Sequence, residues 1–266
     1  MVPPNTSSDD AGRGTDASLA SGHDAAVDAA RPSDAAGSTL GDAASTSADA
    51  AAQPYSPCPG AGVPCKILPL GDSITFGIGY AGSYRVELFN RASRDDKRIT
   101  FVGSVQNGPS MVAGQSFPKN NEGHSGWTID QIAGLVPTPA LANAPHIVLL
   151  MAGTNDVNLN SDLPNAPKRL GALIDKIIAK DAATLIVVAQ ITPLASRGGA
   201  TSPVTTFNRA LPQVVAERSM AGKHVLLVDM NTGFPEGALG DGVHPNQRGY
   251  EWMAGTWYQA IGPLLR

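Results

Sequence analysis

Ser73 is the residue of this sequence best placed to act as a nucleophile. It follows an apolar run of strand length, residues 67–70, and stands in the tripeptide Gly71-Asp72-Ser73. In open α/β sheets, a strand that stops at a glycine delivers the next side chains to the crevice at its carboxyl end. The tripeptide alone also fits a plain turn in which Asp72 and Ser73 bond to the backbone. Residues further along the chain therefore decide between the two interpretations.

Three later residues supply the partners that a serine nucleophile needs. Asn155 follows the apolar run 147–151, and Asp241 and His244 lie in the loop after the run 225–229. Loops that follow parallel strands converge on one edge of a sheet, so these residues can meet Ser73. A histidine can take the serine proton, and an aspartate can orient that histidine. The side-chain amide of Asn155 can donate a hydrogen bond to an oxyanion.

Apolar runs alternate with helical patterns along the chain and predict the fold class. We expect strands and helices in alternation, with strands at residues 67–70, 99–102, 147–151, 185–190 and 225–229, and helices at residues 84–92, 163–180 and 204–221. A last helix carries Trp252 and Trp257. This alternation predicts an α/β protein, a three-layer α/β/α sandwich with a central parallel sheet of about five strands. Pro212 lies inside one predicted helix and is expected to kink or restart it.

A long connection over residues 104–126 is rich in Gly, Asn, Ser and Pro. Long ordered loops in compact domains tend to be functional. The connection runs into Trp127, and the spacing of Thr128 and Gln131 is that of a capping box that begins a helix. His124 and Trp127 are candidates for substrate binding. The alternatives are a loop histidine bonded to nearby backbone and a tryptophan that anchors the following helix.

Composition predicts a tail followed by one folded domain. Residues 1–57 are mostly Ala, Ser, Asp, Gly and Thr, with no periodic apolar pattern, and are predicted to be a disordered tail or linker. Residues 58–266 suit a single domain with a full core. The aspartates of the tail account for the net charge of −4 and leave the domain nearly neutral. A nucleic-acid partner is therefore not expected, and no apolar run has the length of a membrane span.

The two cysteines enclose a short Pro- and Gly-rich loop just before the first predicted strand. Their spacing fits neither a redox pair nor a zinc site, and a disulfide between Cys58 and Cys65 is expected, with two free thiols as the alternative. A disulfide would place the protein outside a reducing cytosol. No signal peptide is visible at the amino terminus, but the tail is typical of a spacer. The expected location is therefore secreted or at the cell surface.

Taken together, the chemical groups resemble the four motifs of the SGNH, or GDSL, hydrolase superfamily. The motifs occur in order, as Gly71-Asp72-Ser73, Gly126 within Gly-His-Ser-Gly-Trp, Gly153-Thr154-Asn155-Asp156, and Asp241-x-x-His244-Pro245-Asn246. The resemblance covers residues 66–262 and implies the flavodoxin-like SGNH hydrolase fold. Several stretches are similar to family 3 carbohydrate esterases, the acetylxylan esterase type, namely residues 122–127, 173–178 and 222–230.

This resemblance implies a serine esterase that works through an acyl-enzyme. Ser73, Asp241 and His244 would be catalytic, and the oxyanion hole would be formed by Ser73, Gly126 and Asn155. The expected substrate is a short-chain acyl ester, most simply an acetyl ester, on a carbohydrate such as acetylxylan. Neither a metal nor a cofactor is expected, and the chain is expected to be a monomer.

Two alternatives remain open at this stage. A lipase, thioesterase or other acylhydrolase would keep the chemistry and change the substrate. A carbohydrate-binding module without activity would leave the same residues unused, but with 5% aromatic residues the chain is poor in the side chains that such a binding face needs.

Overall fold

The computed structural model describes residues 55–60 and 62–266. Nearly all of the predicted tail, residues 1–57, lies outside the described residues. The described chain begins at Tyr55, whose ring stacks on His224 with ring centroids 3.4 Å apart and whose hydroxyl donates to the carbonyl of Ala183. These contacts join the start of the described chain to the segments that precede β8 and β9.

A mostly parallel sheet forms the centre of the domain. Its strand order is β3-β6-β1-β7-β8-β9. β2 pairs with the first residues of β1, and β6 pairs with the last ones. The seven strands are β1 Cys65–Gly71, β2 Ile99–Phe101, β3 Val105–Gln106, β6 Asn120–Gly123, β7 Ile147–Met151, β8 Leu185–Ala189 and β9 Val225–Val228. Because β2 and β6 pair with successive parts of the same edge of β1, the parallel part is five strands wide, and only β3 is antiparallel to its neighbour. The predicted α/β fold with a central parallel sheet is confirmed.

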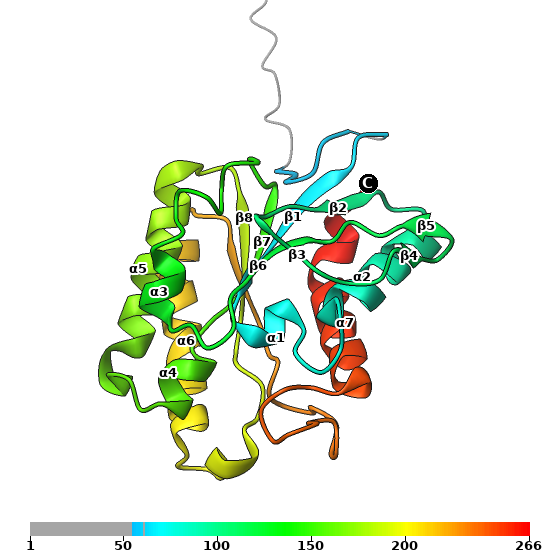
Figure 1. Cartoon of the computed structure of the whole chain (residues 1–266). Coiled ribbons are helices and arrows are strands. Elements are labelled where there is room, and N and C mark those ends of the chain that lie inside the picture. The colour runs from blue at the N-terminus through cyan, green and yellow to red at the C-terminus, as the bar shows by residue number, and fades with distance from the viewer. Residues whose placement is uncertain (1–54, 61) are drawn as a thin grey trace, which may run out of the picture. The chain divides into compact units, whose positions relative to one another are not determined.

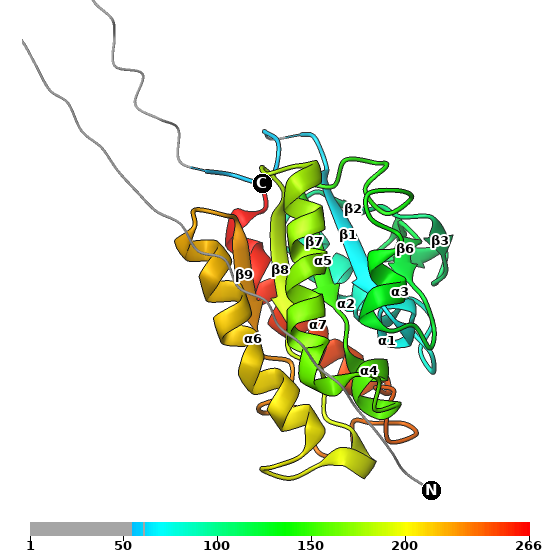
Figure 2. The same cartoon turned by 90° about the vertical axis from the view of Figure 1, so that its left-hand side faces the viewer.

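Helices cover both faces of this sheet. Figure 1 shows α3, α5 and α6 on one face and α2 and α7 on the other, and Figure 2 views the sheet from the side of α5 and α6. The helices are α1 Ser73–Phe76, α2 Ser83–Arg94, α3 Ile129–Ala133, α4 Thr154–Asn158, α5 Ala166–Lys180, α6 Pro203–Met220 and α7 Gln247–Ile261. Every residue of β7 and β8 is buried, as expected for strands covered on both sides.

Pro212 does not restart its helix, and this part of the prediction is wrong. Helix α6 runs without interruption through Pro212. Proline lacks the N–H group that would bond to the carbonyl four residues earlier, which here belongs to Asn208. The side-chain amide of Gln190 donates to that carbonyl at 3.1 Å. The hydrogen bond that proline removes is therefore replaced from the end of β8.

The connection over residues 104–126 contains strands that the sequence did not predict. Besides β3 and β6, it holds a small hairpin of β4 Met111–Val112 and β5 Gln115–Ser116. The buried guanidinium of Arg85 on α2 fastens this connection by donating to the carbonyls of Asn107 and Lys119 and to that of Phe76 in α1. Polar contacts, rather than an apolar pattern, therefore order this segment.

A disulfide joins Cys58 to Cys65 at the start of β1, across seven positions of sequence. Among the described residues, no helix combines the length and apolar character that crossing a membrane would require.

We expect replacement of both cysteines by serine to lower the free energy of unfolding by about 2–3 kcal/mol, because a cross-link restricts the unfolded chain. Urea denaturation would show a lower midpoint for the variant, while the oxidised protein treated with a reductant should approach the same midpoint. An unchanged midpoint in both measurements would contradict a stabilising role.

Candidate active site

Ser73 lies at the carboxyl end of β1, as the first residue of the short helix α1. Asp72 caps this helix, and its Oδ1 accepts a hydrogen bond from the backbone N–H of Ile74 at 2.9 Å. Two glycines allow α1 to pack against the sheet: a Cβ atom on Gly71 would collide with the side chain of Thr75 in α1 as well as with the carbonyl of Met151, and one on Gly123 would collide with the backbone of α1. The sequence places Ser73 here because glycine occupies both positions.

His244 connects Ser73 to Asp241. Its Nε2 lies 2.9 Å from the Oγ of Ser73, and its Nδ1 lies 2.7 Å from Oδ2 of Asp241. The other carboxylate oxygen of Asp241 accepts hydrogen bonds from the backbone N–H groups of Val243 and His244. The three side chains predicted to form a nucleophile, a base and an orienting carboxylate are therefore brought together in one hydrogen-bonded line across 171 positions of sequence.

The Asp241 carboxylate is ionised over the whole neutral range. Hydrogen bonds from the side chain and the backbone of His244 lower the pKa of Asp241 to about 2, although 58% of its side chain is exposed. An ionised carboxylate accepts the Nδ1 proton of the imidazole, which leaves Nε2 as the basic nitrogen toward Ser73.

Asn155 and Gly126 are brought to the same part of the site. Asn155 lies in the first turn of α4, directly after β7, and its Nδ2 donates to the carbonyl of Trp127 at 2.9 Å. Gly126 precedes Trp127 and has a φ of +80°, which a side chain would strain. The loop that carries Gly126 is held against β1 by a hydrogen bond from the N–H of His124 to the carbonyl of Gly71.

His124 and Trp127 contact each other, and Glu122, which was not predicted as a site residue, contacts His124. The rings of His124 and Trp127 are stacked with centroids 4.4 Å apart. Nε2 of His124 lies 2.8 Å from Oε2 of Glu122, whose side chain is fully buried. The spacing Glu122-x-His124 was the available signal, because residues two apart on an extended segment share one face. The Thr128 and Gln131 capping box at the start of α3 is confirmed.

Asp156 fixes α4 in its position. One of its carboxylate oxygens accepts from the N–H of Ile129 at 3.0 Å, and the other pairs with Arg169 at 2.8 Å. Asp156 is fully buried, so these contacts offset the cost of removing its charge from water. The contacts join α4 to α3 and α5.

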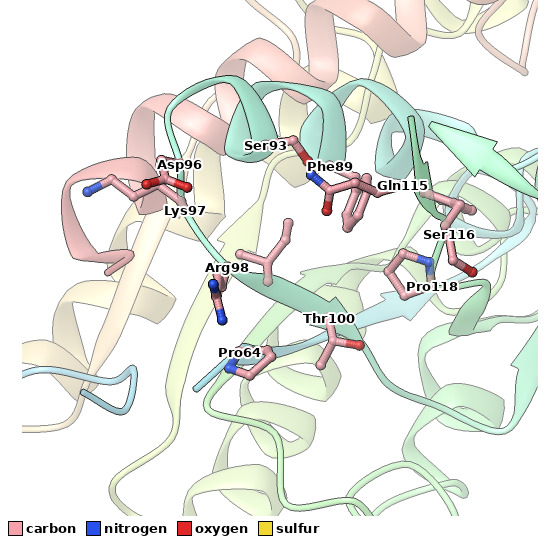
Figure 3. Close-up of a pocket in the computed structure, with 12 residues that line it drawn as sticks. Pro64, Phe89, Ser93, Asp96, Lys97, Arg98, Thr100, Gln115, Ser116 and Pro118 are labelled. Carbon is pink, nitrogen blue, oxygen red and sulfur yellow. The ribbon is translucent and has the colours of Figure 1, made fainter. Parts of the chain in front are cut away.

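A pocket of about 560 Å³ lies elsewhere in the domain (Figure 3). Its walls include Pro64, which precedes β1, and Ile99, which begins β2. The pocket is thus near the amino ends of the parallel strands, whereas Ser73 follows the carboxyl end of β1. No candidate catalytic residue lines it. In the part of the chain that the structure describes, no group of three or more His, Cys, Asp and Glu side chains could hold a metal ion.

The comparison with protein families agrees with this geometry. Residues 70–252 match the model of the GDSL-like Lipase/Acylhydrolase family, and the chain belongs to this family. The described domain is accordingly a carboxylic ester hydrolase.

Family 3 carbohydrate esterases are among the solved structures that the chain resembles. One from Clostridium thermocellum is 35% identical, with a TM-score of 0.67, and the match covers 76% of this chain and 98% of that chain. One from Talaromyces cellulolyticus is 29% identical, with a TM-score of 0.66 and coverage of 75% and 97%. A curated multidomain esterase of Ruminococcus flavefaciens is 29% identical over 224 residues, which are 76% of this chain and 29% of that protein. The chain therefore spans less than a third of the length of this curated relative.

Asp72 should make the stability of the domain depend on pH. Its side chain is fully buried, and burial raises its pKa to about 6. Between about pH 4 and pH 6 the unfolded chain releases this proton while the folded chain retains it, so the contribution of Asp72 to stability is full below pH 4 and falls as pH rises. We expect the free energy of unfolding of wild type, relative to Asp72→Asn, to fall by about 2 kcal/mol between pH 4 and pH 7.

Urea denaturation at both pH values measures this difference, with the exposed Asp96→Asn as a matched control. A difference between wild type and Asp72→Asn that stays constant with pH would show that the Asp72 carboxyl titrates alike in the folded and unfolded chains.

Proposed function

We propose that the protein is a serine esterase that removes short acyl groups, chiefly acetyl, from carbohydrate, with acetylxylan as its substrate. The observation that carries this proposal is the position of His244 between Ser73 and Asp241, at 2.9 and 2.7 Å. The arrangement supports a nucleophile, a general base and a carboxylate that fixes the tautomer of that base.

In the proposed reaction, Ser73 Oγ attacks the ester carbonyl carbon while Nε2 of His244 accepts the hydroxyl proton. The tetrahedral intermediate collapses when His244 returns this proton to the leaving sugar oxygen, which breaks the ester bond and leaves an acyl-serine. A water molecule then attacks the acyl-serine with the same help from His244, and acetate and free Ser73 are released. Asp241 stabilises the imidazolium that forms in each half of the cycle.

Three groups are proposed to stabilise the oxyanion. The backbone N–H of Ser73 lies in the first turn of α1, where N–H groups have no partner within the helix. Among the described residues, neither this N–H nor that of Gly126 donates a hydrogen bond. Asn155 uses one amide hydrogen on Trp127 and retains the other. All three donors are therefore free to bind the developing negative charge.

The proposed substrate is supported by the exposure of the site and by the chain's relatives. Of the line of three side chains, Asp241 is 58% exposed and His244 is 21% exposed, which suits a shallow site open to a polymer. Two similar solved structures are family 3 carbohydrate esterases, and the curated relative is a multidomain esterase. The Cys58–Cys65 disulfide supports a place of action outside a reducing cytosol.

Acetate release from acetylated xylan tests both nucleophile and substrate. We expect the purified wild type to release acetate from the polymer and to cleave 4-nitrophenyl acetate, and Ser73→Ala to do neither, because the alanine has no oxygen to acylate. Ser219→Ala, which removes a hydroxyl that bonds only within α6, serves as control and should match wild type. Cleavage of the chromogenic ester alone by wild type would leave the mechanism standing and overturn the carbohydrate substrate.

Asn155→Ala should reduce turnover several hundredfold, since loss of one oxyanion donor typically costs about 2.7–4 kcal/mol of transition-state stabilisation. Steady-state kinetics with 4-nitrophenyl acetate, alongside Asn158→Ala on the same helix, would measure this effect. Circular dichroism would establish that both variants fold. Turnover close to that of wild type in Asn155→Ala would remove this side chain from the mechanism.

A further inference from the structure

Glu122, His124 and Trp127 form a connected group beside the proposed oxyanion donors. Trp127 follows Gly126 directly, and its carbonyl accepts the hydrogen bond from the amide of Asn155. An ester whose acyl oxygen lies against these donors would bind next to the residues that carry them, and Trp127 is one of these.

Glu122 holds this group in place through its contact with His124. It lies on β6 opposite Leu70 of β1, is fully buried, and its carboxylate accepts hydrogen bonds from the N–H of Ser104 and from His124 Nε2. A buried carboxylate is costly unless it is paired, and here both of its oxygens are engaged. The direct result of burying Glu122 is that the ring of His124, two residues further along the chain, is held in place.

The fixed imidazole has two consequences for a neighbouring ligand. It supports one face of the Trp127 ring by stacking, while Trp127 remains only partly buried. In the neutral tautomer that donates its Nε2 proton to Glu122, Nδ1 is an acceptor. Among the hydrogen bonds of residues 55–60 and 62–266, none uses Nδ1 of His124. An aromatic plane beside an unused acceptor matches a pyranose ring, which has an apolar C–H face and hydroxyl donors.

We propose that Trp127 and His124, fixed by Glu122, form a sugar-binding subsite that selects carbohydrate as the alcohol part of the ester. This rests on the proposed function and adds the residues that determine its specificity. One pyranose ring stacks on the indole, and one of its hydroxyls donates to Nδ1 of His124. Glu122 is a positioning residue, because it acts only through His124.

The two roles of Trp127, sugar platform or helix anchor, differ in which substrate they affect. We expect Trp127→Ala to lower kcat/KM for acetylated xylo-oligosaccharide, chiefly through KM, by about tenfold more than it lowers kcat/KM for 4-nitrophenyl acetate, because only the sugar can stack. Trp127→Phe should recover most of the activity on the oligosaccharide. An equal loss on both esters, or no loss on either, overturns the subsite.

The histidine offers a matched control within the chain. His224 also stacks on an aromatic ring, that of Tyr55, but it precedes β9 at the opposite end of the strands from Ser73. His124→Ala and Glu122→Gln should raise KM for the oligosaccharide severalfold, whereas His224→Ala should leave it unchanged. If His224→Ala has the same effect as His124→Ala, the loss is one of stability and the proposal fails.

Binding to an enzyme that cannot turn over separates this proposal from the proposed esterase activity. Calorimetry with Ser73→Ala and deacetylated xylo-oligosaccharide should show binding that the further substitution Trp127→Ala weakens about tenfold. This result would support the subsite even if no acetylated carbohydrate were hydrolysed. No binding by Ser73→Ala, together with normal acetate release from xylan by wild type, would overturn the subsite and leave the esterase proposal intact.

Discussion

The site depends on how three parallel strands meet at the carboxyl end of β1. Leu70 and Gly71 pair with β7 on one side and with Glu122 and Gly123 of β6 on the other. The loops after these strands must then leave the sheet side by side, which places Ser73 between the loop of Gly126 and that of Asn155. Side chains at Gly71 or Gly123 would push α1 away from the sheet. The position of α1 sets that of Ser73, whose Oγ lies 2.9 Å from Nε2 of His244.

Buried charges, each with several partners, hold the loops around this junction. Arg85 has backbone carbonyls rather than a carboxylate around its guanidinium, and burial lowers its pKa to about 10, so it remains a cation at neutral pH. Glu122 and Asp156 are equally buried and are satisfied by N–H groups and by side chains of His124 and Arg169. Buried polar groups of this kind destabilise any arrangement that breaks one contact. They therefore favour a single loop geometry over the alternatives.

The same polar contacts explain which parts of the fold could not be predicted from the sequence. β7 and β8 are covered on both faces, so their residues are uniformly apolar and both strands were recognised. The contact between Ser73 and His244 could also be predicted, because a parallel topology brings the loops after the strands to one edge of the sheet. β6 was not recognised, because its buried residues are Asn121, Glu122 and Gly123 rather than apolar ones, and the strand with which it pairs in parallel, β1, is not adjacent in the sequence. Continuity of α6 through Pro212 likewise depends on Gln190, which no local pattern reveals.

Two aspartates at this edge have pKa values shifted in opposite directions, and the directions follow from their surroundings. Asp241 lies largely in solvent and accepts hydrogen bonds from the side chain and backbone of His244, which lower its pKa to about 2. Asp72 is adjacent to Ser73 but fully buried, and burial raises its pKa to about 6. The role proposed for Asp241, to stabilise an imidazolium, requires a carboxylate that stays ionised, and its low pKa meets this requirement. Asp72 needs only one acceptor oxygen to cap α1, so it can tolerate the protonation that burial favours. The raised pKa of Asp72, beside the proposed nucleophile, therefore reflects the close packing around Ser73 rather than acid–base chemistry.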